Sequence, residues 1–186
     1  MDTIWFYIVL GFNHVTDLEG LDHFYFITAL ALPYSFRKFP KLIWWVTLFT
    51  IGHTLSLIGN YYLKLPVSSY WIELFIPVTI AFGCIPLLLQ KKLDEGFFAS
   101  VLTLVFGGIH GLGFGRYFSL VVDQFSPRLS LLSFAFGVEF AQIGIVFLII
   151  FLNYIIAKNF QALKYWRLGM GILIFILALV MIVERF

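Results

Sequence analysis

The sequence predicts an all-α protein with several membrane-spanning helices, and this prediction rests on its composition and on the length of its apolar runs. Of the 186 residues, 61% are hydrophobic and 12% are charged, whereas a soluble domain carries about 25% charged residues. A transmembrane helix needs about 20 mostly apolar residues. A chain of this length therefore holds about six spans joined by short loops, and we expect residues 1–186 to form a single transmembrane domain.

The apolar runs define six expected spans. Each run ends near charged residues, a proline or a cluster of small polar residues, which are the signals that interrupt apolar helices. The expected spans cover residues 20–36, 41–63, 70–90, 97–118, 129–157 and 165–183.

The first nineteen residues need a separate interpretation. Residues 4–12 are apolar but too few to cross a bilayer, and no positively charged segment precedes them as in a signal peptide. We expect residues 1–19 to form an interfacial or re-entrant segment. A seventh span over residues 3–18 would bury His14 and Asp17, and each charge at the bilayer centre costs about 2.5–3.5 kcal/mol.

The basic residues predict the orientation of the chain. They alternate between the two sides, and most of the 12 follow the first, third and fifth spans: Arg37, Lys38, Lys41, Lys91, Lys92, Lys158, Lys164 and Arg167. The richer side is expected to be cytoplasmic, which places both termini outside. Because the basic residues form short clusters beside the membrane and the net charge is only +2, no nucleic-acid partner is expected.

Two ionisable residues fall in the middle of expected spans, where such side chains usually mark a functional site. His53 lies near the middle of residues 41–63. Glu139 lies about ten residues into the fifth span, or roughly 15 Å deep at 1.5 Å per residue. Further polar residues share their helix faces: Thr50, Ser56 and Asn60 beside His53, and Gln142 beside Glu139. For one such residue alone, a hydrogen bond between helices, worth about 0.6 kcal/mol, is an equally good explanation.

The other histidines lie toward the outer side in this topology. His110 falls in the outer half of the fourth span, His14 lies in the N-terminal segment, and Asp22 and His23 begin the first span at the outer surface. We expect these groups to converge on a cavity that opens outward. The expected metal ligands are His14, Asp22, His23, His53, His110 and Glu139, and the expected supporting polar residues are Ser56, Asn60, Gln142 and Glu73.

A glycine-rich segment surrounds His110. Gly107, Gly111 and Gly115 recur at four-residue spacing, which lets another helix approach closely. Gly108 and Gly113 are additional to this pattern. They predict a local opening of the helix that would bring backbone carbonyl groups to a cavity.

Several motifs together resemble the HupE/UreJ family over nearly the whole chain. In order along the sequence they are Gly11-Phe12-Asn13-His14, Gly20-Leu21-Asp22-His23-Phe24, Phe49-Thr50-Ile51-Gly52-His53, Phe106-Gly107-Gly108-Ile109-His110-Gly111 and Phe136-Gly137-Val138-Glu139-Phe140-Ala141-Gln142. The resemblance implies a six-span protein of the bacterial cytoplasmic membrane that takes up nickel for hydrogenase or urease. Seven residues separate His14 from Asp22 here, which is more than in the nickel-associated members.

Ligand chemistry favours a divalent transition metal as the substrate. Imidazole suits nickel, zinc, copper and cobalt, whereas a cluster of thiolates, which would trap a soft ion, is ruled out by the single cysteine. The sequence contains no ATP-binding loop. Uptake would therefore be driven by the membrane potential or coupled to another ion.

The alternative is an intramembrane zinc-dependent hydrolase that acts on a lipid or a peptide. Three histidines and an aspartate could hold zinc and leave one position for water, while Ser56 or Glu139 assists proton transfer. The sequence alone leaves open whether the protein is an enzyme, and whether the metal is nickel as a substrate or zinc as a cofactor. The expected partners are the lipid bilayer and the metal ion, and a homo-oligomer or an accessory membrane protein also remains open.

Overall fold

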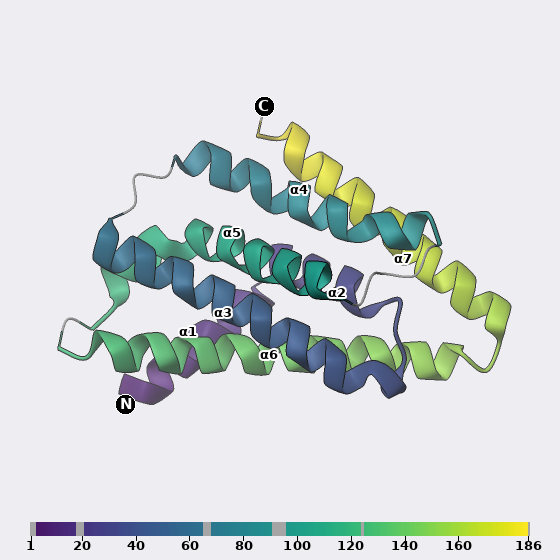
Figure 1. Cartoon of the computed structure of the whole chain (residues 1–186), viewed down its shortest axis with the longest axis horizontal. Coiled ribbons are helices and arrows are strands. Elements are labelled where there is room, and N and C mark those ends of the chain that lie inside the picture. The colour runs from purple at the N-terminus through teal and green to yellow at the C-terminus, as the bar shows by residue number, and fades with distance from the viewer. Residues whose placement is uncertain (1–2, 18–20, 65–67, 91–95, 124, 186) are drawn as a thin grey trace.

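The computed structural model describes residues 3–17, 21–64, 68–90, 96–123 and 125–185. These residues form seven α-helices, one short 3-10 helix and no strand (Figure 1). The helices are α1 (Thr3–Thr16), α2 (Asp22–Ala31), α3 (Phe39–Leu63), α4 (Ser69–Leu88), α5 (Phe97–Val121), α6 (Pro127–Ile156) and α7 (Phe160–Val183), and the 3-10 helix η1 (Phe36–Lys38) precedes α3.

Five helices, α3 to α7, are long and apolar enough to cross a membrane. The shortest, α4, has 20 residues, which at 1.5 Å per residue matches the apolar thickness of a bilayer. Their outward faces carry exposed large apolar side chains, Leu132 and Phe140 among them, and lipid is the solvent that suits such a surface. The prediction of an all-helical membrane protein is thus confirmed for the last five expected spans.

The first expected span, residues 20–36, does not form one long helix. Within it only α2 is α-helical, and it has ten residues. It ends two residues before Pro33, whose ring is incompatible with the interior of a helix. The backbone carbonyl groups freed at this end accept hydrogen bonds from the Asn153 side chain, at 2.9 Å to Leu32 and 3.0 Å to Tyr34.

Helices α1 and α2 extend in succession along the length of the bundle (Figure 1). Near the start of α1, the Tyr7 hydroxyl donates to the carbonyl oxygen of Val121, at the end of α5, over 2.8 Å. Just after α2, the Tyr34 carbonyl oxygen accepts from Arg167, near the start of α7, over 3.0 Å. Since α5 finishes at one end of the bundle and α7 begins at the other, the two short helices together reach from end to end.

Glycines bring two pairs of helices into backbone contact. Between α3 and α5, a Cβ at Gly107 would overlap the backbone of Phe49, and one at Gly52 would overlap that of Leu104. Between α1 and α6, Gly11 lies equally close to the backbone of Phe134. The predicted glycine packing face on α5 is therefore confirmed.

The local opening predicted at the additional glycines is wrong. Helix α5 is continuous from Phe97 to Val121. Gly113 packs toward the Ile76 side chain of α4, and Gly108 faces the backbone of Gly52. Gly108 therefore belongs to the contact with α3, whereas Gly113 accommodates α4, and neither interrupts the helix.

Candidate metal centre

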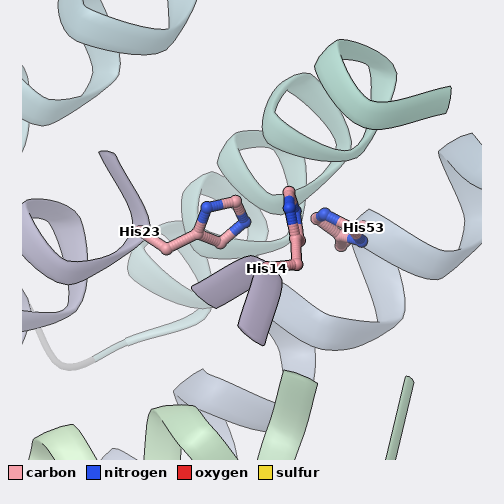
Figure 2. Close-up of side chains that lie close together, drawn as sticks. All are labelled: His14, His23 and His53. Atoms are coloured by element: carbon pink, nitrogen blue, oxygen red, sulfur yellow. The ribbon is translucent and has the colours of Figure 1, made fainter. Parts of the chain in front are cut away.

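Three histidines from three different helices meet inside the bundle (Figure 2). His14 lies near the end of α1, His23 near the start of α2 and His53 in the middle of α3. Each offers a ring nitrogen, and the three nitrogens lie within 4.8 Å of one another. The ring centroids form a triangle, with 4.7 Å between His14 and His23, 5.5 Å between His14 and His53, and 5.4 Å between His23 and His53.

His110 adds a fourth ring from α5. Its centroid lies 5.2 Å from that of His23, and its Nδ1 lies 2.8 Å from the carbonyl oxygen of Phe106. Because a carbonyl oxygen only accepts, this Nδ1 carries the hydrogen and the Nε2 of His110 presents its lone pair. The Nδ1 contact therefore fixes the tautomer that a metal ligand requires.

All four histidines bury an Nε2 atom that has no hydrogen-bond partner among the described residues. His23, His53 and His110 are each only 1% exposed. A buried polar atom without a partner costs about 1–3 kcal/mol, so four in one cluster call for a shared ligand. The imidazole nitrogens of His14, His23 and His53, within 4.8 Å of one another, suit a borderline divalent ion such as Ni²⁺, Co²⁺ or Zn²⁺.

Asp22 lies behind His23. Its Oδ1 accepts from the Nδ1 of His23 at 3.0 Å and from the backbone N–H of the same residue at 2.9 Å. A carboxylate on the far nitrogen of a ligating imidazole orients the ring and increases its basicity. Asp22 was expected from the sequence to be a ligand, and in the structure its Oδ1 contacts the Nδ1 of His23.

The family model described as "HupE / UreJ protein" matches residues 1–185. The chain belongs to the HupE/UreJ family. This family is associated with nickel and cobalt transport, and imidazole nitrogens of the kind gathered here suit both ions. No curated protein and no solved structure matches the chain.

Aromatic side chains enclose the histidines of this HupE/UreJ protein. Phe114 lies against His14, with 3.9 Å between the ring centroids. Phe134 stacks on His53 at 6.1 Å, and Phe49 lies 5.1 Å from His110. The sequence analysis did not identify these residues as part of the site, because phenylalanines on apolar helices have no distinguishing pattern. An apolar shell of this kind lowers the local dielectric constant and controls the access of water.

Asp22 and His23 lie deeper than the sequence analysis expected. They were predicted at the outer surface, but His23 contacts His53, which is in the middle of α3. The difference arises because residues 3–16 form a helix that enters the bundle, so α2 begins inside it. His14, predicted in the segment before the first span, is carried to the same depth.

Glu139 lies in a separate polar cluster between α6 and α3. Its Oε1 accepts a hydrogen bond from the Thr47 hydroxyl over 2.6 Å, and its Oε2 accepts one from Thr50. The Thr50 Oγ1 also lies 3.0 Å from the Oε1 of Gln142. Thr50 is one helical turn from His53, so this cluster is adjacent to the histidines but Glu139 is not part of the three-histidine group.

The other expected polar residues lie toward the C-terminal ends of α3 and α5 and the N-terminal end of α4. The Ser56 hydroxyl donates to the carbonyl oxygen of His53 at 2.7 Å, and Asn60 accepts from Ser119 at 3.3 Å. Gly111 and Gly115 of α5 pack on Ser56 and Asn60. The polar stripe beyond His53 is therefore covered by α5 in this conformation.

A cavity of about 850 Å³ opens at the end of the bundle where α3 and α5 finish and α4 begins. Asn60 and Glu73 line it, together with Arg116 and Lys64. The four histidines, all within the described residues, are not among its lining. Glu73 also lies 3.9 Å from Arg185, just after α7.

Proposed function

We propose that this HupE/UreJ protein is a permease for a divalent transition-metal ion, with nickel as the expected substrate. The observation that carries the proposal is the buried group of His14, His23 and His53, whose ring nitrogens lie within 4.8 Å of one another and whose Nε2 atoms lack a partner, with the His110 ring beside His23. A permease must bind its ion strongly enough to admit it and weakly enough to release it. Neutral imidazoles without a thiolate meet this requirement, and the only cysteine, Cys84, is buried on α4 away from these groups.

The proposed topology has six crossings and both termini outside, in the cytoplasmic membrane of a bacterium. Helices α3 to α7 provide five, and α1 followed by α2 provides the sixth as a broken span. Transporters commonly bind ions where a discontinuous helix exposes its ends near the bilayer midplane. The basic residues of η1 and of the turn between α6 and α7 would then lie in the cytoplasm, as the positive-inside rule requires. Residues 1–186 would form one transmembrane domain.

The side chains around the histidines support transport better than hydrolysis. A zinc-dependent hydrolase needs a base or a nucleophile next to the metal-bound water. The two candidates from the sequence are otherwise engaged, because Ser56 donates to its own helix and Glu139 accepts from Thr47 and Thr50. We therefore assign these histidines to ion binding during transport.

Nickel uptake into proteoliposomes tests this function. The purified protein is expected to accumulate nickel with a saturable rate when the vesicle interior is negative, and His53→Ala is expected to abolish the accumulation. Thr103→Val on α5 is a matched control, because Thr103 is equally buried but donates only to the Ala99 carbonyl of its own helix. Stoichiometric zinc that survives purification, without any ion movement, would contradict the permease and favour the hydrolase.

A further inference from the structure

The polar cluster one turn from the histidines consists only of oxygen ligands. The carboxylate of Glu139 contacts the hydroxyl groups of Thr47 and Thr50, and the Gln142 side-chain oxygen completes the group. The carbonyl oxygen of Val46 also lies 3.2 Å from the Thr50 hydroxyl. Oxygen-only sets of this kind prefer hard cations, whereas the imidazole cluster prefers borderline transition metals. The two neighbouring groups therefore offer different ligand chemistry.

The charge of this cluster is not balanced by the protein. Among the described residues, no lysine, arginine or histidine forms an ion pair with Glu139. Thr50 is 8% exposed and Gln142 is fully buried, while Glu139 is half-buried. A carboxylate at this depth in a membrane requires a compensating charge.

We propose that Glu139, Thr47, Thr50 and Gln142 bind a sodium ion that is transported together with the metal. One carboxylate with several neutral oxygens compensates a single positive charge, which suits a monovalent hard cation better than a divalent one. Ions that drive secondary transport are commonly held at such midplane sites. The coupling role rests on the permease function proposed above, but sodium binding by this cluster does not.

The helices that form both sites provide a physical route for coupling. Thr50 and His53 lie on successive turns of α3, while Phe134 and Glu139 lie little more than one turn apart on α6. Phe134 stacks on His53, and Glu139 is hydrogen-bonded to Thr50. A sodium ion coordinated by both Glu139 and Thr50 would hold α3 against α6, and with it the His53 ring proposed to bind the metal.

Binding of radioactive sodium to the purified protein tests the site without any assumption about transport. Saturable binding is expected for the native chain, and Glu139→Gln and Thr50→Val are each expected to weaken it by at least about tenfold, because the first removes the negative charge and the second removes an oxygen ligand. Thr103→Val is expected to bind normally. Nickel binding in the same samples shows whether each variant is folded, because neither substitution changes the four histidines. An absence of saturable sodium binding, or unchanged binding in Glu139→Gln with nickel binding intact, would overturn the proposal.

Uptake measurements then test the coupling. Replacement of external sodium by choline is expected to slow nickel uptake by about tenfold or more in the native protein. Nickel uptake that is indifferent to sodium, or that depends on a proton gradient instead, would overturn the coupled transport. Sodium binding in a protein that moves no nickel would refute the permease and the coupling, but not the sodium site.

Discussion

Gly111 of α5 lies directly against His53 of α3: a Cβ at position 111 would overlap both the backbone of His53 and the hydroxyl of Ser56. The glycine thus sets how closely α5 approaches the helix that carries a central histidine. It also brings His110, the preceding residue, to the same depth as His53.

Gly111→Ala is expected to destabilise the protein and to weaken nickel binding. The added methyl group must push α3 and α5 apart, and such overpacking costs about 1–3 kcal/mol. Gly144→Ala on α6 is the matched control, since nothing lies within 4 Å of a Cβ there. Thermal unfolding in detergent, with and without nickel, measures both effects. Equal melting temperatures for the two variants would contradict the close contact.

Asp22→Asn is expected to lower nickel affinity by about 10–100-fold without loss of the fold, because the amide cannot stabilise positive charge on His23 as the carboxylate does. Glu73→Gln is a suitable control, since Glu73 is exposed and contacts Arg185 instead. Titration calorimetry provides the affinities. A native affinity in Asp22→Asn would show that Asp22 does not position the ring.

His110 is expected to act as a fourth ligand. The variant His110→Ala should bind nickel more weakly than the native protein, because one of four imidazole nitrogens is lost. The nickel K-edge absorption spectrum should show fewer imidazole nitrogens around the ion. An unchanged spectrum in a folded His110→Ala variant would limit the site to His14, His23 and His53.

Nickel binding is expected to weaken as the pH falls. Each histidine must be neutral to ligate a metal, so protons compete with nickel for the same Nε2 atoms. The apparent affinity should therefore fall as the pH is lowered from neutral values into the range where the buried rings take up protons. Equilibrium dialysis across this range measures the effect, and a pH-independent affinity would argue against imidazole ligands.

The proposed topology predicts different labelling of two turns. In a protein with Cys84→Ala, a cysteine introduced by Phe125→Cys, between α5 and α6, is expected to react with an impermeant maleimide from outside. One introduced by Asn159→Cys, between α6 and α7, should react only after permeabilisation. Both positions lie in turns at the ends of the helices. Phe125 is between α5 and α6 and is 99% exposed, and Asn159 directly precedes α7. The reverse labelling pattern would show that the chain has the opposite orientation in the membrane.

The sequence predicted the features that depend on long runs and regular spacing. The five long helices follow from apolar runs that are long enough to span, and the contact of Gly107 with α3 follows from the four-residue spacing of small residues. The failure at residues 20–36 has a local cause. Their apolar composition resembles a span, but Pro33 and the polar residues before Asp22 confine the helix to ten residues.

The separation of Glu139 from the histidines could not be predicted from the sequence. A difference of one helical turn in depth is smaller than the uncertainty of a predicted helix boundary. Thr47, however, could have been found. The spacing that linked Thr50 to His53 extends one step back to Thr47, and this residue donates to Glu139.

Counterflow of nickel tests the central claim most directly, because it requires one site to exchange ions with both sides of the membrane. Proteoliposomes loaded with unlabelled nickel are diluted into a trace of radioactive nickel, and label inside the vesicles is followed over time. The native protein is expected to concentrate the label transiently above its equilibrium level, whereas His53→Ala should not. An absence of this overshoot in the native protein, or an equal overshoot in folded His53→Ala, would contradict transport through the histidine site.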